Sequence, residues 1–216
     1  WTGARGFDIE AAQTFKNDPS PFARARVAAS LRDASKDQAE EAKALWLTFA
    51  LAGPLDDRVY LECLGLGAEG RESELFTELL TVDLPPSAIL PLVWRLHPEQ
   101  ALPWLVAFAN DGRNSLEQRQ MATDAIAFMT SLEAAEAMLV LALSGPEDLR
   151  DMASYWVRHR RENDWRDFDL GGSLAGDFDA AELAFETGVI RDSTITPIDL
   201  DVIATEVVWL VVGDAG

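Results

Sequence analysis

The residue types that could do chemistry are few in this chain and lie far apart. The two histidines are His97, at the end of an expected helix before a proline, and His159, in a basic cluster at another helix end. A cation near a helix C-terminus complements the helix dipole, so we expect both histidines to be structural. The single cysteine, Cys63, lies in an apolar stretch, where we expect a small buried side chain rather than a nucleophile. We therefore predict no catalytic residue.

A glycine pattern invites comparison with nucleotide-binding loops. Gly65, Gly67 and Gly70 match the spacing G-x-G-x-x-G. They follow an expected helix rather than a strand, however, and Glu69 and Glu72 would repel a pyrophosphate. We reject a nucleotide site and predict no bound cofactor.

Three aspartates near the C-terminus are the remaining candidates for a metal site. Asp199, Asp201 and Asp214 could offer oxygen ligands to calcium, but solvated carboxylates at a strand edge are the interpretation we favour. One cysteine cannot build a zinc or iron–sulfur site, and it excludes an intramolecular disulfide. We predict no metal ion.

Charge limits the classes of partner. The 216 residues include 37 acidic and 18 basic side chains, a net charge of −19. Such a surface repels phosphate backbones and anionic lipids, so we expect no nucleic-acid partner. No apolar run reaches the ~18–20 residues that span a bilayer, so we expect no direct membrane insertion. An apolar share of 48% supports a folded core.

Hydrophobic periodicity predicts short helices up to about residue 165. Prolines and glycines separate them. In the second helix we expect Phe22, Val27, Ala28 and Leu31 to be buried. The predicted helices cover residues 8–16, 21–32, 36–51, 58–66, 72–80, 86–96 and 98–109, and others begin near residues 116 and 147.

Three helix starts share one pattern, in which a capping or helix-starting residue leads to Arg-x-x-Ala. The arginine and alanine pairs are Arg26 and Ala29, Arg119 and Ala122, and Arg150 and Ala153. Self-similarity at a spacing of roughly 30–45 residues is typical of helical-repeat solenoids. We predict a mainly α fold, an α-solenoid of antiparallel helix pairs over residues 1–167, with an irregular helical bundle as the alternative.

The pattern changes after residue 167. Residues 168–187 contain Gly171, Gly172 and Gly176 and are predicted to be a linker. Residues 188–216 alternate like β-strands and end in the apolar run 207–212. Because so few strands cannot form a stable domain, we expect either a truncated β-sandwich, which we favour, or strands packed on the solenoid end. Both chain ends are expected to be internal to a longer protein.

Several phrases carry a family resemblance. They are DRVYLECLGLGAEGRE at 57–72, WRLHP at 94–98, and the stretch from DLR at 148–150 to NDW at 163–165. Together they resemble the HEAT-repeat region of large planctomycete-type membrane-bound dehydrogenase proteins, over about residues 18–167. In that family the repeats lie between a β-propeller and a c-type cytochrome. Residues 198–216 resemble the opening strands of an NPCBM-type carbohydrate-binding module.

The resemblance implies a HEAT-like, non-catalytic scaffold within a larger exported protein, periplasmic or associated with the cell envelope. Its partners would be flanking domains of the same chain or another protein. The alternative is carbohydrate binding through the C-terminal segment, and an independent enzyme is the third hypothesis. No CxxCH motif and no propeller lie in this sequence, so no haem, quinone or sugar-binding residue is carried over.

Overall fold

The structure is a computed structural model that describes residues 7–170. This part of the chain is mainly helical, as predicted, and contains no strand. It divides into two units, Trp1–Pro98 and Glu99–Gly216. The predicted β-rich segment 188–216, with its carbohydrate-binding role, and all but the first three residues of the predicted linker lie outside the described residues. The helices are α1 (Ile9–Gln13), α2 (Pro21–Ser30), α3 (Ala39–Ala52), α4 (Arg58–Gly67), α5 (Glu72–Thr81), α6 (Pro86–Leu96), α7 (Leu102–Asn110), α8 (Leu116–Ala127), α9 (Leu132–Ser144) and α10 (Glu147–Arg161), with short 3₁₀ helices at Leu31–Asp33, Lys36–Gln38 and Glu99–Ala101.

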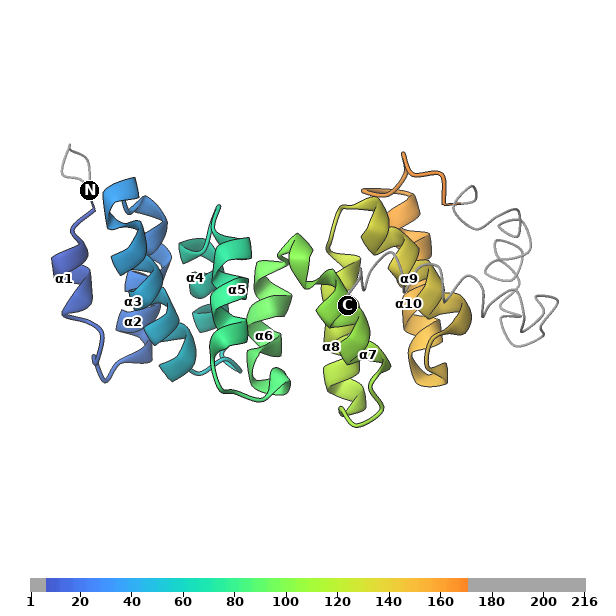
Figure 1. Cartoon of the computed structure of the whole chain (residues 1–216), viewed down its shortest axis with the longest axis horizontal. Helices are drawn as coiled ribbons and strands as arrows, with labels where there is room; N and C mark the ends of the chain where they lie inside the picture. Colours follow the sequence, from blue (N-terminus) through green and yellow to red (C-terminus); the bar gives the residue numbers. More distant parts are fainter. Residues whose placement is uncertain (1–6, 171–216) are drawn as a thin grey trace, which may run out of the picture. The chain divides into compact units, whose positions relative to one another are not determined.

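In the first unit, successive helices alternate between two layers. Helices α2, α4 and α6 contact one another in chain order, and α1, α3 and α5 do the same. Figure 1 shows these helices running up and down, joined by short connections. We call α2, α4 and α6 the first-helix layer and α1, α3 and α5 the second-helix layer.

Local sequence explains where the helices begin. The Ser20 hydroxyl accepts a hydrogen bond from the Ala23 N–H at 3.3 Å. Pro21 follows at the first helical position, where a backbone N–H would have no partner within the helix, so its absence costs nothing. The Asp57 carboxylate accepts from the Val59 N–H at 2.8 Å in the same way. Proline and capping side chains therefore set the breaks between helices.

The core of the first unit joins α3 to α4 through aromatic side chains with polar ends. Trp46 is fully buried, and its indole N–H donates to the carbonyl oxygen of Leu64 at 2.8 Å. The buried Tyr60 hydroxyl donates to the carbonyl oxygen of Phe49 at 3.0 Å. Each ring fills the space between helices while its polar group satisfies a buried backbone carbonyl.

Helices one pair apart in the first unit run in the same direction. Near their C-terminal ends α2 and α4 come so close that a Cβ at Gly67 would lie 1.9 Å from the Ala28 carbonyl oxygen. Near their N-terminal ends α3 and α5 are joined by Lys43 and Glu74, at 2.8 Å. The C-terminal ends of α2 and α4 therefore lie together, as do the N-terminal ends of α3 and α5, so each pair is parallel.

The second unit is built around helix α8. Helix α8 packs on α7, α9 and α10, and α9 packs on α10. Fully buried alanines, including Ala122 and Ala153, line these contacts and allow close approach. Beyond the helix ends, the buried Trp165 indole N–H donates to the carbonyl oxygen of Met129 at 2.9 Å.

Two expectations for α2 are wrong. Phe22 is 64% exposed rather than buried, and Val27 is half-buried, whereas Ala28 and Leu31 are buried as predicted. Phe22 lies in the first turn of α2, and one apolar residue cannot define the buried face of a short helix.

The repeat register in α2 also needs correction. Arg119 and Arg150 are the fourth residues of α8 and α10, and the fourth residue of α2 is Arg24, not Arg26. Arg24 and Arg150 each donate to a backbone carbonyl just before their own helix, those of Asp18 and Gly145. At the shared position Arg24 and Arg150 therefore support the start of their own helices, whereas Arg119 binds Asp148 on α10. Arg26 does not occupy this position.

Candidate functional site

The two histidines lie at helix ends, as their neighbours in the sequence predict. His97 follows α6 in a left-handed conformation with φ 46°, and its backbone N–H donates to the Val93 carbonyl oxygen at 3.0 Å. It ends the helix in the way that glycine usually does. His159 lies in the last turn of α10, stacked on Tyr155 with ring centroids 5.9 Å apart and planes within 4°. Both positions have a structural explanation.

Cys63 is half-buried in α4 rather than fully buried. Burial raises the pKa of its thiol, the charges of Asp57 and Glu62 raise it further, and only Arg26 acts in the opposite direction. A thiol held protonated is a poor nucleophile. The side chain serves instead as part of the surface described below.

The glycine pattern serves helix packing. Gly65 and Gly67 lie inside α4, and Gly70 takes a positive φ of 76° in the turn that follows. A Cβ at Gly65 would lie 2.2 Å from the guanidinium carbon of Arg95. Gly67 allows α4 to approach the backbone of α2 at Ala28. The spacing therefore reflects two close approaches and a turn.

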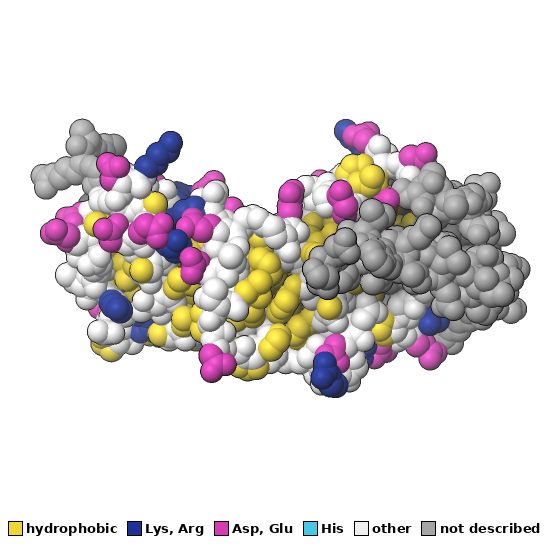
Figure 2. All heavy atoms as spheres, in the orientation of Figure 1, with side chains coloured by type: hydrophobic (Ala, Val, Ile, Leu, Met, Phe, Trp, Pro, Cys, Tyr) yellow, Lys and Arg dark blue, Asp and Glu magenta, His cyan; other side chains and the backbone are white. Residues whose placement is uncertain are grey.

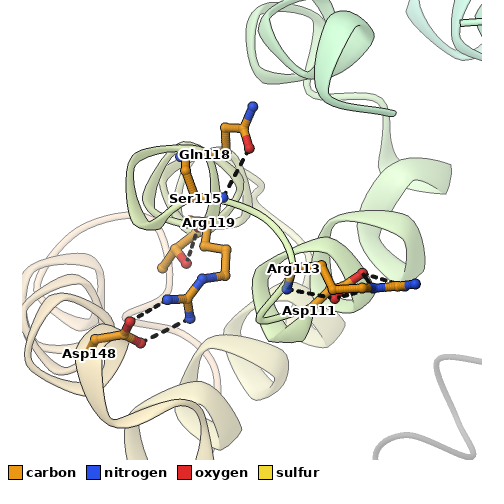
Figure 3. Close-up of polar contacts among 7 residues, drawn as sticks. Asp111, Arg113, Ser115, Gln118, Arg119 and Asp148 are labelled. Carbon is orange, nitrogen blue, oxygen red and sulfur yellow. Dashed lines mark hydrogen bonds and ion pairs between the residues drawn. The ribbon is translucent and has the colours of Figure 1, made fainter. Parts of the chain in front are cut away.

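Polar contacts repeatedly join residues about one helix pair apart. In the second unit both guanidinium Nη atoms of Arg119 donate to the carboxylate of Asp148, one of them at 2.9 Å (Figure 3). Arg119 is 8% exposed, and its hydrogen bonds hold the pKa of Asp148 below its usual value. Further along the same helices the Trp156 indole N–H donates to Asp124 at 2.8 Å. Two contacts thus hold α8 and α10 parallel.

Around Arg119 the connection before α8 is organised by its own side chains. The guanidinium of Arg113 pairs with the carboxylate of Asp111, which lowers the pKa of Asp111 to about 2 (Figure 3). Ser115 and Gln118 form a reciprocal capping box at the start of α8. These groups shape a turn and do not converge on a common point with Arg119 (Figure 3).

The second-helix layer of the first unit carries an acidic network. Lys43 on α3 pairs with Glu40 at 2.9 Å, with Glu74 at 2.8 Å and with Glu78 at 3.4 Å. Hydrogen bonds to Glu40 and Glu74 raise the pKa of the lysine. Figure 2 shows acidic side chains gathered with a few basic ones over the end of the first unit that holds α1 and α3.

The first-helix layer of the same unit has the opposite charge. Helices α2, α4 and α6 carry four arginines and one glutamate, whereas α1, α3 and α5 carry six glutamates and one lysine. The one glutamate, Glu62, is held by Arg58 and by Arg95, each with N–O at 2.6 Å. Burial opposes its ionisation, but the two guanidiniums outweigh burial and lower its pKa.

Exposed arginines and apolar side chains occur together on this layer. Arg26 lies 5.9 Å from the centre of the Phe22 ring, and Arg58 lies 4.8 Å from the centre of the Trp94 ring. We call the surface formed by Phe22, Arg26, Arg58, Val59, Leu66 and Trp94 the arginine–aromatic face. On α4, Cys63 lies one turn from both Val59 and Leu66, and the charge of Arg26 on α2 partly offsets the rise in the pKa of its thiol.

The arginine–aromatic face was not predicted. Helical periodicity places Trp94 on an apolar face, where core packing would account for it, but this ring is only half-buried. Val59 is 62% exposed and Leu66 43%. One signal in the sequence points to this face: Arg26 follows Phe22 by four residues, one helical turn, in a chain where acidic side chains outnumber basic ones.

The described residues offer no metal-binding cluster and no membrane-spanning helix. Among residues 7–170, no three or more histidine, cysteine or carboxylate side chains are placed to hold a metal ion. None of the described helices combines the length and apolarity required to cross a bilayer. The three aspartates considered for calcium lie outside the described residues. No protein-family model, curated protein or solved structure matches the chain.

Proposed function

We propose that the described chain is a non-catalytic helical-repeat scaffold of the HEAT-like type, whose function is to bind other protein segments. The observation that carries this proposal is the recurrence of hydrogen bonds between residues about one helix pair apart. They join residues 29 to 40 positions apart, in both units. An irregular bundle has no reason to repeat separations within this range in both of its units.

The directions of the helices support the same proposal. In a stack of helix pairs, each helix lies parallel to its equivalent in the next pair and buries an apolar face that one pair could not bury alone. Parallel neighbours of this kind occur at α3 and α5, joined by Lys43 and Glu74, and at α8 and α10, joined by Arg119 and Asp148.

The use of the charged residues favours binding over catalysis. Arg24, Arg119 and Arg150, which are among the more buried cations, hold backbone carbonyls or a neighbouring helix. The exposed Arg26 and Arg58 lie on a helical surface that also carries exposed apolar side chains. Such a surface presents contact area to a partner rather than enclosing a small substrate.

The wider setting is part of the proposal and rests on the sequence resemblance. In that setting this chain is an internal region of an exported bacterial protein, between or beside dehydrogenase and cytochrome domains. Coding sequence on either side that contains neither a propeller, nor a haem motif, nor a further β-domain would contradict the setting but leave the scaffold proposal intact.

Site-specific photo-crosslinking in the producing cells tests the scaffold proposal. A photoreactive amino acid is placed singly at Val59 and Leu66 on the first-helix layer, and at Glu41 and Leu80 on the second. The proposal expects at least one position to give an adduct of constant mass with a discrete protein or neighbouring domain. It is refuted if no position gives such an adduct, or if the purified chain alone turns over a substrate.

A further inference from the structure

The first-helix layer of the first unit departs from the charge of the whole chain. Acidic side chains outnumber basic ones by 37 to 18. A random helix surface in such a chain should therefore be acidic, and α1, α3 and α5 conform with six glutamates against one lysine. Helices α2, α4 and α6 reverse the ratio, so a separate explanation is required for their arginines.

Internal structure accounts for two of the four arginines. Arg24 donates to the carbonyl of Asp18 before its own helix, and Arg95 pairs with Glu62 over Gly65. Arg26 has no ion pair within the described residues and is exposed. Arg58 shares Glu62, yet its side chain remains 70% exposed. These two guanidiniums are the available cations of the surface.

Both available guanidiniums lie beside aromatic rings. An arginine stacked near a ring loses little conformational freedom on binding and keeps N–H donors at its edge for a planar acceptor. Carboxylates match that edge with two parallel hydrogen bonds. Arg26 beside Phe22 and Arg58 beside Trp94 are thus prepared to hold carboxylates.

Exposed apolar side chains lie on the same two helices as the two cations, α2 and α4. Phe22 is 64% exposed, Val59 62% and Leu66 43%, on two helices that pack tightly together. Exposed apolar side chains on neighbouring helices, accompanied by charged ones, are typical of a protein-binding surface. Burial of these three side chains against a partner would favour binding through the hydrophobic effect.

We propose that the arginine–aromatic face docks an acidic, amphipathic peptide segment of a partner protein. Two carboxylates of the segment bind Arg26 and Arg58, and its apolar side chains pack on Phe22, Val59 and Leu66. Carboxylates are favoured over polyphosphates because the net charge of −19 repels a polyanion at long range, whereas a short segment needs only two local contacts. This inference rests on the proposed function and names the face and the class of partner.

A random 12-residue peptide library displayed on phage, selected against the immobilised full chain, tests the inference. Non-specific attraction to an acidic protein enriches basic peptides, so enrichment of acidic peptides indicates a specific basic site. We expect selected sequences to be enriched in Asp and Glu over Lys and Arg, and to contain Leu, Phe or Trp near the acids. Enrichment of basic or uncharged sequences, or failure to select any, overturns the inference.

The best selected peptide is then titrated by calorimetry against variants. Arg26→Glu with Arg58→Glu should weaken binding at least tenfold. Arg113→Glu with Arg166→Glu is the matched control, because those side chains are 90% and 71% exposed in the second unit, and it should change binding less than twofold. Equal losses in both double variants overturn the inference.

Further measurements separate a loss of binding contacts from a loss of stability. Thermal melts followed by circular dichroism must agree for the two double variants, and Val59→Ser, which keeps both arginines, should weaken binding at least threefold if apolar contact contributes. A phosphorylated version of the peptide or an oligonucleotide that binds more tightly than the acidic peptide would also overturn it. Each of these results would overturn the docking inference and leave the scaffold proposal standing. If no photo-crosslinking position gives an adduct, the scaffold proposal fails as well.

Discussion

Replacing Gly67 with alanine tests the packing that brings α2 and α4 together. The added Cβ would lie 1.9 Å from the carbonyl oxygen and 2.8 Å from the carbonyl carbon of Ala28. Unbonded carbon and oxygen normally stay about 3.3 Å apart. The two helices would therefore have to separate by about 1.4 Å, the difference between the two distances, because the obstructing atoms are backbone.

The expected cost follows from two opposing effects. Overpacking against backbone costs about 3 kcal/mol. Replacing a glycine inside a helix with alanine returns about 1 kcal/mol through helix propensity. The net loss in the free energy of unfolding is therefore about 2 kcal/mol, which lowers the Tm by about 4–8 °C in a protein of this size.

Gly65→Ala is the matched control, because it adds the same methyl group to the same helix. Its Cβ would meet only the guanidinium of Arg95, whose side chain is 26% exposed and can move. The helix gain of about 1 kcal/mol offsets a weakened surface ion pair of about 0.5 kcal/mol, so stability should stay within about 0.5 kcal/mol of wild type.

Urea denaturation and hydrogen exchange by mass spectrometry measure both variants. Gly67→Ala should lower the denaturation midpoint, and its faster exchange should appear in α2 and α4 but not in α8 and α10. If Gly67→Ala is as stable as Gly65→Ala, the close approach of these helices is not real and the reasoning is refuted.

Three other predictions concern the second unit. Ala122→Glu and Ala153→Glu each place a charge at a fully buried contact and should cost about 3 kcal/mol, and unchanged melting curves for both would contradict the repeat register. Trp165→Phe removes the indole donor from a buried carbonyl and should lower the free energy of unfolding, measured by urea denaturation, by about 2 kcal/mol; a change below about 0.5 kcal/mol would mean that the bond contributes little. Hydrogen bonds from Arg119 lower the pKa of Asp148, so its stabilising effect is present above the ordinary pKa of about 4 and is lost as pH falls through the lowered value. Asp148→Asn should therefore lower the Tm by a few degrees at pH 7 but hardly at all at pH 2, and an equal difference at both would count against this linkage.

Local signals in the sequence predicted much of the helical framework. Helix α6 spans the predicted residues 86–96, and α4 and α5 each extend one residue beyond their predicted ends. Proline and capping side chains such as Ser20 and Asp57 act on the nearest backbone groups, so their effect needs no distant partner. Helix α9 has no corresponding prediction, because its sequence LEAAEAMLVLALS is apolar on nearly every side and lacks a clear period.

The candidate site was much less predictable than the helices. Trp46 and Trp94 both follow an apolar helical pattern, yet the first is fully buried and the second only half-buried. The difference depends on which neighbouring helix covers each ring. Similarly, Arg24 and Arg26 differ by two positions, and only the observed start of α2 shows which one supports the backbone.

By itself the sequence determined the acidic charge, the mainly helical fold of the described residues and most helix limits, because composition, proline and capping act locally. The tertiary structure decided that Gly65 and Gly67 serve helix packing rather than a phosphate, since their role depends on atoms of α2 and α6. It also decided that arginines and apolar side chains from three helices share one face. That property arises only when residues far apart in the chain are brought to the same surface.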